Sequence, residues 1–260
     1  MQEQITFKNT RISYLQQGKG AVIVLLHGFL ENKTMWKNIA EVLSKNNRVV
    51  SIDLLGHGAS ENTGYIHSME EMAASVKAVL DTLKIRKSII IGHSMGGYVA
   101  LSFADLFPKN TKGICLLNST PINDSPEKVI HRNRAVAALK QQLTTFIKIA
   151  IPNLFAPNSK TSFGLEIDQV ITAALTTSKQ GAVAATEGMK TRKNYVEFFS
   201  KSSIKKLVIL GKEDPVLALN TQLEIYKNSA IPVEILAGGH MSHIESFNTL
   251  IPLLKKFVRN

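Results

Sequence analysis

An apolar run that leads directly into the pattern Gly-x-Ser-x-Gly constrains the fold of this chain more than any other feature. Residues 88–91 have the composition of a buried strand, and residues 98–104 have that of a helix. A serine at such a strand-to-helix turn has a strained backbone and an exposed hydroxyl. Glycine suits positions 92 and 96, because a Cβ atom there would collide where strand and helix pass closely. Ser94 is therefore the candidate nucleophile.

Strand and helix patterns alternate along the chain, which predicts an α/β fold with a mostly parallel, twisted sheet of about eight strands and helices on both faces. The predicted strands cover residues 5–7, 11–15, 21–26, 48–54, 88–91, 111–117, 206–210 and 233–236. The predicted helices cover residues 35–43, 69–83, 98–107, 219–227 and 244–258.

The alternation breaks between residues 120 and 203, where helical patterns follow one another at 128–149, 167–177 and 182–199. No strand pattern is convincing in this stretch, and residues 152–161 have turn composition. We therefore expect a catalytic core formed by residues 1–119 and 204–260. Residues 120–203 are expected to form a helical cap on the side of Ser94.

The net charge of +11 raises the question of nucleic-acid binding. The lysines and arginines are scattered, and the chain has no arginine-rich arm, zinc-ligand set or RNA-recognition aromatic pattern. Net charge bears on solubility and nonspecific attraction rather than on fold. We expect a lysine-rich solvated surface and no nucleic-acid partner, and the sequence leaves the oligomeric state open.

Several features favour a cytoplasmic protein. No apolar run reaches the roughly 20 residues of a membrane span. The segment Met1–Ile5 lacks the basic and apolar regions of a secretory signal. Cys115 is the only cysteine, which excludes an intramolecular disulfide, and its apolar neighbours predict a buried thiol in a strand.

A serine hydroxyl is a poor nucleophile and needs a base, for which histidine has a suitable pKa. A carboxylate must in turn hold the imidazole in the right tautomer. The sequence supplies both groups after Ser94, each just past the end of a predicted strand: Asp214 follows residues 206–210, and His240 follows residues 233–236. The order Ser, Asp, His is the one expected for a nucleophile at a strand-to-helix turn.

With these motifs the chain resembles the α/β-hydrolase superfamily over nearly its whole length outside residues 120–203. The resemblance implies that Ser94 is the nucleophile, that His240 is its base and that Asp214 orients the base. It also implies an oxyanion hole formed by the backbone N–H groups of Phe29 and Met95. The matching segments are His27–Phe29, Asp53–Ser60, Gly92–Gly97, Gly211–Pro215 and Gly239–Glu245.

Neighbouring residues offer alternatives for the base and the acid. His243 lies close to His240, but His240 directly follows the glycine pair that ends the predicted strand. Glu213 adjoins Asp214, and Asp124 follows the strand at which some members of the superfamily carry their acid. We assign His240 and Asp214, and we expect His243 to pack in the first turn of the following helix. The Asp53–Ser60 turn is expected to have an architectural role.

Residues of the matching motifs are the candidates for substrate binding: His27, Phe29 and His93. We expect His27, His57 and His93 to form hydrogen bonds near the site rather than to carry protons. No grouping of His, Cys, Asp or Glu has metal-ligand spacing, and no nucleotide fingerprint occurs, so no metal or other cofactor is expected.

Basic residues in 120–203 and two further histidines are expected at the surface: Arg132, Arg134, Arg192, Lys193, His67 and His131. The four basic residues have an alternative role, the attraction of an anionic substrate.

Epoxide hydrolases and haloalkane dehalogenases share many of these motifs but have aspartate as the nucleophile, so the serine indicates acyl transfer through an acyl-enzyme. We expect a serine hydrolase that cleaves a carboxylic ester with a small or medium acyl chain, chosen by the cap. On the same triad the alternatives are lactone, thioester or carbon–carbon bond hydrolysis, perhydrolysis, and a lyase step as in menaquinone biosynthesis. A ligand receptor with this fold is a further class, against which the complete Ser, Asp and His set argues.

Overall fold

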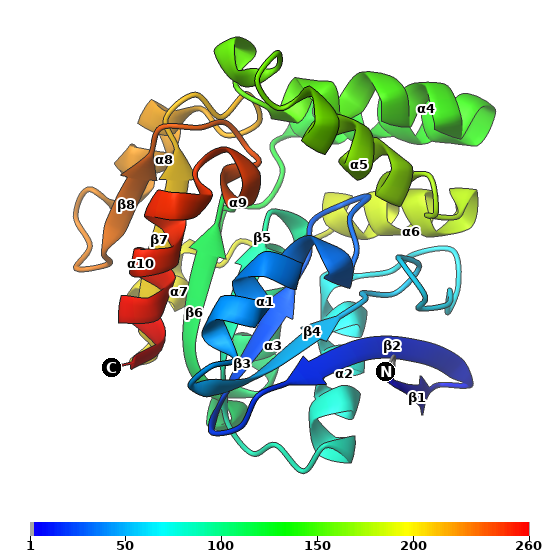
Figure 1. Ribbon diagram of the computed structural model, residues 1–260. Coiled ribbons are helices and arrows are strands. Elements are labelled where there is room, and N and C mark those ends of the chain that lie inside the picture. Colours follow the sequence, from blue (N-terminus) through cyan, green and yellow to red (C-terminus); the bar gives the residue numbers. More distant parts are fainter. Residues whose placement is uncertain (1–2, 260) are drawn as a thin grey trace.

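The computed structural model describes residues 3–259, so residues 1 and 2 of the N-terminal segment used above, and residue 260, lie outside it. Within that range eight strands form one sheet in the order β1-β2-β4-β3-β5-β6-β7-β8 (Figure 1). Strand β2 runs antiparallel to both of its neighbours, and the strands from β4 to β8 run parallel to one another. The strands are β1 (Glu3–Phe7), β2 (Thr10–Gln17), β3 (Ala21–Leu26), β4 (Asn47–Ile52), β5 (Ser88–His93), β6 (Thr111–Leu117), β7 (Lys205–Gly211) and β8 (Val233–Leu236).

Helices cover both faces of the sheet, as the alternation predicts. On one face α2 (Met69–Thr82) and α3 (Met95–Leu106) pack with α8 (Leu219–Tyr226), and on the other α1 (Lys37–Leu43) packs with α10 (Phe247–Arg259). Within β5, Ile90 joins the first cluster, whereas Ile89 and Ile91 join the second. Because both faces of the strand are covered, its sequence is continuously apolar instead of alternating.

The chain between β6 and β7 is here called the insertion (residues 118–204). Its helices are α4 (Pro126–Ala150), α5 (Gly164–Ala174), α6 (Lys179–Lys190) and α7 (Val196–Lys201), with short 3-10 turns at Pro152–Leu154 and Pro157–Ser159. The insertion begins beyond the carboxyl ends of the strands, where Figure 1 shows α4, α5 and α6, and returns along one face of the sheet through α7. An apolar cluster joins it to the core, with Leu139, Ile147 and Phe155 packed against Leu30 and Met241.

Two predicted helices are each divided in the structure, and a third, predicted over 128–149, is kinked within α4 at Gln142, which has a φ of −143° and a ψ of 68°. The prediction of one helix over 182–199 is wrong, because α6 ends at Lys190 and the side chain of Asn194 accepts the backbone N–H of Val196 at the start of α7. The prediction of one helix over 244–258 is also wrong, because the chain breaks at Ser246 between α9 (Ser242–Glu245) and α10.

The Asp53–Ser60 turn is a buried polar structure. Asp53 accepts hydrogen bonds from the backbone N–H groups of Lys33 at 2.7 Å and Ala59 at 2.9 Å, and pairs with the Lys33 ammonium at 2.5 Å. Both side chains are almost fully buried. These contacts agree with the architectural role expected for this turn.

The prediction that His67 lies at the surface is wrong. His67 is fully buried because the loop that carries it packs against α6, where its backbone N–H donates to the carbonyl of Ala184 at 2.9 Å. His131 is exposed, as expected.

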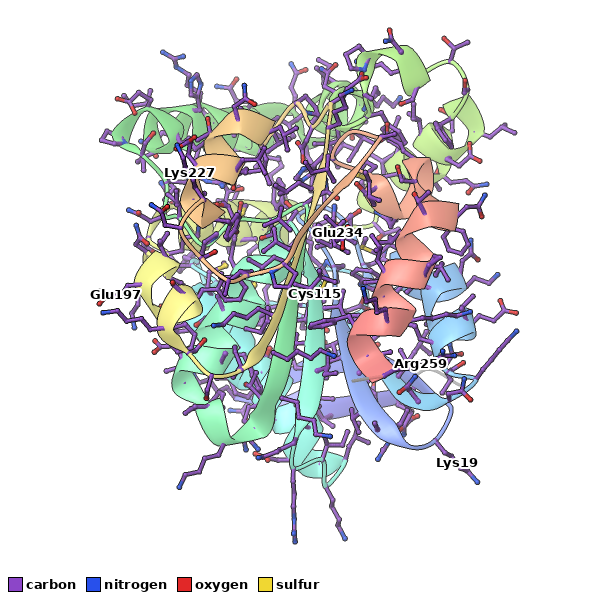
Figure 2. The ribbon with its side chains drawn as sticks, turned by 90° about the vertical axis from the view of Figure 1, so that its left-hand side faces the viewer. Lys19, Cys115, Glu197, Lys227, Glu234 and Arg259 are labelled. Atoms are coloured by element: carbon purple, nitrogen blue, oxygen red, sulfur yellow. The ribbon has the colours of Figure 1, made fainter. Side chains whose placement is uncertain are left out.

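Figure 2 shows Cys115 in the interior and Lys19, Lys227 and Arg259 projecting from different parts of the outside. Cys115 is buried in β6, which confirms the expectation of a buried strand cysteine, and this burial raises the pKa of its thiol well above the ordinary value. None of the helices in residues 3–259 is both long enough and apolar enough to cross a membrane.

Candidate active site

Ser94 occupies the turn between β5 and α3 with a backbone conformation that few residues adopt. Its φ is 48° and its ψ is −114°, in a region that is strained for a side-chain-bearing residue. The surrounding chain holds this conformation: the N–H of Ser94 donates to the carbonyl of Leu117 at 3.0 Å. Its own carbonyl accepts from the N–H of Gly97 at 2.9 Å and from the hydroxyl of Ser119 at 2.7 Å.

The two glycines of the motif allow this turn to pack closely. A Cβ on Gly92 would lie 2.3 Å from the carbonyl oxygen of Gly96, and a Cβ on Gly96 would lie 2.2 Å from that of Leu26. Both distances are far inside van der Waals contact and involve backbone atoms. The steric requirement inferred from the sequence is therefore present in the structure.

The three residues predicted for the triad meet at the carboxyl edge of the sheet. Nε2 of His240 lies 2.9 Å from Oγ of Ser94, and Nδ1 of His240 lies 2.8 Å from Oδ2 of Asp214. Burial raises the pKa of Asp214, but the charge of His240 and its hydrogen bonds to His240, Asn118 and Leu217 lower it more, so the net shift is downward. Asp214 is thus a carboxylate that accepts from the imidazole.

Asn118 holds the acid in place, a contact that the sequence analysis missed. Its side-chain amide donates to Oδ2 of Asp214 at 3.0 Å and to the carbonyl of Gly239 at 3.1 Å. The other oxygen of Asp214 accepts the backbone N–H groups of Val216 at 2.8 Å and Leu217 at 3.0 Å. The available signal was the position of Asn118 directly after β6, beside the strand that carries the nucleophile.

The alternative residues are engaged elsewhere. His243 is buried in α9 as expected, and burial lowers its pKa to about 3. Glu213 is exposed, and Asp124 pairs with Arg132 and Arg192. None of the three hydrogen-bonds to Ser94 or to the ring of His240 among the described residues.

Two backbone N–H groups lie on the loops that flank the serine. Met95 is the first residue of α3, and Phe29 lies in the loop after β3, here called the β3 loop (residues 27–32). Neither N–H group finds an acceptor within residues 3–259. The ring of Phe29 is half-buried, which leaves it as the candidate substrate contact.

His27 and His93 require a correction, because the structure gives neither of them a surface for substrate. Both are at most 1% exposed. Nδ1 of His27 donates to the carbonyl of Gly28 at 2.8 Å, and its Nε2 accepts the N–H of Leu54 at 2.9 Å. His93 contacts Glu31 and the carbonyl of His240. Both histidines are therefore assigned to hydrogen bonding within the protein, the role also expected for His57.

The expectation that Arg192 lies at the surface is also wrong. It is 6% exposed and pairs with Asp124 at 2.7 Å, and its guanidinium lies 4.1 Å from the centre of the Tyr98 ring. It donates to the carbonyls of Ile122 and Met189 as well. Arg192 thus links the insertion to α3, and it shares the single carboxylate of Asp124 with Arg132.

Glu245 joins the insertion to the loop that carries His240, here called the His240 loop (residues 237–241). One of its carboxylate oxygens accepts the N–H of Ala156 at 2.9 Å and the hydroxyl of Ser159 at 2.5 Å. The other accepts the N–H of Gly239 at 3.0 Å. The N–H of His240 itself donates to the carbonyl of Leu154 at 2.8 Å.

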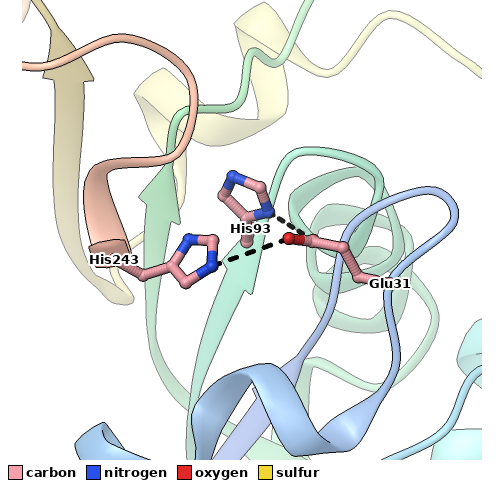
Figure 3. A group of neighbouring side chains, drawn as sticks. All are labelled: Glu31, His93 and His243. Carbon is pink, nitrogen blue, oxygen red and sulfur yellow. Dashed lines mark hydrogen bonds and ion pairs between the residues drawn. The ribbon is translucent and has the colours of Figure 1, made fainter. Parts of the chain in front are cut away.

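Glu31, His93 and His243 form a buried group whose donor atoms all lie within 4.8 Å of one another (Figure 3). Spacing in the sequence did not reveal it, because the three residues come from three distant segments. A cavity of about 530 Å³ lies beside Glu31 and His243, between α1, α5 and α10. Ser94 does not line that cavity, so we do not assign it to the reacting part of a substrate.

Comparison with known proteins places this geometry in context. A family model described as the alpha/beta hydrolase fold matches residues 21–247. Among curated proteins, the chain is similar to a putative 2-succinyl-6-hydroxy-2,4-cyclohexadiene-1-carboxylate synthase of Bacillus subtilis (strain 168), with 26% identity over 95% of this chain and 94% of that protein.

Two solved structures also resemble the chain. A thermophilic esterase from Thermogutta terrifontis superimposes with a TM-score of 0.93 and 25% identity, over 100% of this chain and 98% of that one. An enol-lactonase from Burkholderia xenovorans LB400 gives a TM-score of 0.91 with 22% identity, over 99% of this chain and 100% of that one. The second likeness shows the fold alone.

Proposed function

Because this chain belongs to the alpha/beta hydrolase fold family, we propose that it is a serine hydrolase that cleaves a carboxylic ester with a small or medium acyl chain. The observation that carries the proposal is the 2.9 Å contact between Nε2 of His240 and Oγ of Ser94. The similarity to an esterase at 25% identity over the full chain supports the same reaction class.

In the proposed reaction His240 acts first as a base. Its Nε2 takes the proton of Ser94 while Oγ attacks the ester carbonyl, and the charge that develops on the carbonyl oxygen is stabilised by the N–H groups of Phe29 and Met95. The tetrahedral intermediate collapses, the imidazolium gives its proton to the leaving alcohol, and the acyl group stays on Ser94. Water, activated by His240, then releases the acid and restores the free serine.

The contacts of Asp214 explain how the base is kept ready. Its carboxylate accepts from Nδ1 of His240, so Nε2 carries the lone pair that faces Ser94. The lowered pKa of Asp214 keeps the carboxylate ionised, which stabilises the imidazolium when it forms.

A second candidate is a synthase reaction of the kind named for the Bacillus subtilis relative, carried out on the same triad. A substrate that bears a carboxylate calls for an uncompensated cation near the serine. Arg192 and Arg132 both pair with Asp124, and Lys33 pairs with Asp53. Asp124 compensates only one of these two arginine charges, and the ester reaction remains the first choice on the likeness to the Thermogutta terrifontis esterase.

Covalent labelling followed by a substrate series tests the proposal. A fluorophosphonate probe should label the wild-type protein on Ser94, as located by peptide mass spectrometry, and should not label Ser94→Ala. Short p-nitrophenyl esters should be turned over, and esters should exceed matched lactones and thioesters in kcat/KM.

Absence of both labelling and turnover would refute the serine hydrolase. A higher kcat/KM for lactones or thioesters would overturn the ester and keep the hydrolase. Turnover of the synthase substrate alone would establish the second candidate.

A further inference from the structure

A single carboxylate oxygen links the β3 loop to the strand that carries the nucleophile. Oε2 of Glu31 accepts the N–H of Gly28 at 2.7 Å and lies 2.7 Å from Nδ1 of His93. His93 is the last residue of β5, immediately before Ser94. Figure 3 shows the two side chains in direct contact, and their side chains are only 4% and 1% exposed.

The partners of His93 define its protonation. Its Nε2 lies 2.9 Å from the carbonyl oxygen of His240, which can only accept a hydrogen bond. Its Nδ1 faces Oε2 of Glu31, and because the pKa of Glu31 is lowered this oxygen belongs to a carboxylate that can only accept, so each ring nitrogen is placed as a donor. An imidazole that donates from both nitrogens is a cation, and His93 therefore forms a buried ion pair with Glu31.

Electrostatics agree with this reading of the hydrogen bonds. Burial disfavours both charges, but the charge and hydrogen bond of His93 lower the pKa of Glu31 to about 2. In the same way burial lowers the pKa of His93, but Glu31, together with the carbonyl of His240 and the charge of Asp214, raises it by more, so the net shift is upward.

We propose that Glu31 and protonated His93 are positioning residues that hold the β3 loop and the main chain of His240 in register with Ser94. This inference rests on the proposed function of Ser94 and His240. Gly28 precedes Phe29, the proposed oxyanion donor, and a Cβ on Gly28 would lie 2.4 Å from Oε2 of Glu31 and 2.8 Å from Nδ1 of His93. The pair is thus packed directly against the β3 loop. Because it contacts both Gly28 and the carbonyl of His240, it sets the distance between the N–H of Phe29 and the base His240.

A metal site is the competing interpretation, because His243 completes a set of three donors. The 2.7 Å contact between Oε2 and Nδ1 has the length of a hydrogen bond. A zinc ion between two such atoms, with bonds of roughly 2.0 Å to each, would require them to lie farther apart. Nε2 of His243 is 3.7 Å from the other oxygen of Glu31, so His243 is a neighbour of the pair without a hydrogen bond to it.

Four groups from different segments face His93. Glu31 comes from the β3 loop, His243 from α9 and His240 from the His240 loop, and Asp214 acts through space from beyond His240. Glu31 is the only carboxylate among them that touches the His93 ring. When Glu31 loses its charge, burial is no longer offset, and His93 should lose a proton near neutral pH and with it one of its two hydrogen bonds.

Glu31→Gln tests the pair, since it keeps the size and the acceptor for Gly28 while removing the charge. With p-nitrophenyl acetate we expect kcat at pH 8 to fall roughly 10- to 100-fold with KM little changed, as for a misplaced catalytic group. The ratio of variant to wild-type kcat should rise when the pH is lowered from 8 to 6, because His93 regains its proton.

Two control variants separate positioning from the loss of a buried charge. His93→Gln retains an amide that can donate to the carbonyl of His240, so it should lose less activity and show a ratio that does not change with pH. Asp124→Asn breaks another buried ion pair in the insertion, and it should lower Tm without a pH-dependent ratio.

Nitrogen NMR of ¹⁵N-histidine-labelled protein gives a measurement that needs no activity. The ring of His93, assigned by its loss in His93→Gln, should be doubly protonated at pH 8 in the wild type and not in Glu31→Gln. A singly protonated His93 in the wild type would overturn the proposal, and so would a variant ratio that is constant with pH. Wild-type activity lost in EDTA and restored by Zn²⁺ would establish the metal site instead. If the wild type is inactive and unlabelled by fluorophosphonate, the proposed function fails while the NMR result still decides the ion pair.

Discussion

Two of the side chains that meet at the site project from residues with a left-handed backbone. Ser94 has a φ of 48° and Asn118 a φ of 45°, and each directly follows a strand of the sheet. The N–H of Ser94 donates to Leu117, and that of Asn118 donates to Ile209 at 2.8 Å. Each strained residue is therefore held by the next strand along the sheet, so the sheet itself sets the separation of the nucleophile and the support of its acid.

Removal of the Asn118 amide should weaken the site without removing any member of the triad. In Asn118→Ala, Asp214 and the carbonyl of Gly239 both lose a donor. We expect kcat on a short ester to fall roughly 10-fold or more, with KM little affected, because the acid and the base are less well oriented. Asn123→Ala, which truncates an exposed asparagine, is the matched control. Wild-type kcat in Asn118→Ala would show that the backbone N–H groups alone are sufficient to orient Asp214.

Alanine variants of the neighbouring histidines His240 and His243 should differ sharply in kcat. His240→Ala removes the proposed base and should reduce kcat by roughly 10³-fold or more. His243→Ala leaves the triad intact and should mainly lower Tm, because it opens a hole beside Trp36, whose ring lies 6.4 Å away. Steady-state kinetics and thermal melting on both variants decide the matter, and the reverse ranking of kcat would refute the choice of His240.

At the scale of helices and strands, apolar periodicity predicted the sheet and the helices on its faces correctly, since burial on one or both sides determines those patterns. The divided helices were not predictable in this way. Helix α7 begins where the side chain of Asn194 accepts the N–H of Val196, and the chain leaves the helical conformation at Ser246 after α9, two local features that apolar spacing does not encode.

The site shows the same limit of the sequence. The order of motifs led to Ser94, Asp214 and His240, whereas the contacts of Glu31 and Asn118 became visible only in three dimensions. Their partners lie 62 and 96 residues away.

Glu245 provides a prediction for the junction between the insertion and the sheet. Its carboxylate only accepts, and each of its hydrogen bonds within residues 3–259 comes from a donor, so the amide group of Glu245→Gln would face N–H groups that lose their acceptor. We expect a loss of roughly 2 kcal/mol in the free energy of unfolding, and faster hydrogen exchange at Ala156. Glu197→Gln, at a side chain that is 79% exposed, should leave both unchanged. Equal stability of Glu245→Gln and the wild type would contradict this assignment.

On the scale of the whole molecule, most of the buried histidines and carboxylates with shifted pKa values in residues 3–259 fall into two sets. Burial lowers the pKa of His57 and of His243 to about 3 and also lowers those of His27 and His67, so these groups fold in the neutral form. The second set consists of the carboxylates Glu31, Asp124 and Asp214. Their charged and hydrogen-bonded partners lower their pKa values by more than burial raises them. Both sets stabilise the protein above the unfolded-state pKa and lose that contribution as the pH falls. Among the buried histidines of residues 3–259, His93, whose pKa is raised, acts in the opposite sense.

Stability should therefore decline as the pH falls below about 6.5, the ordinary pKa of histidine, well before the carboxylates titrate. Each buried neutral histidine contributes a slope of about 1.4 kcal/mol per pH unit. In His243→Ala the loss of unfolding free energy between pH 7 and pH 5 should be smaller than in the wild type by about 2 kcal/mol. Urea unfolding at several pH values measures both slopes, and identical slopes would show that His243 does not fold in the neutral form.

The contacts at Leu154 and Glu245 also restrict how a substrate can reach Ser94. The carbonyl of Leu154 holds the N–H of His240, and Glu245 binds Ala156 and Gly239 together. Any movement that lifts residues 154–159 away from the sheet therefore pulls on the main chain of the base. An opening on that side would displace His240 from Ser94 at the moment when a substrate enters. A substrate that reaches Ser94 with the base still in place therefore has to enter without displacing residues 154–159.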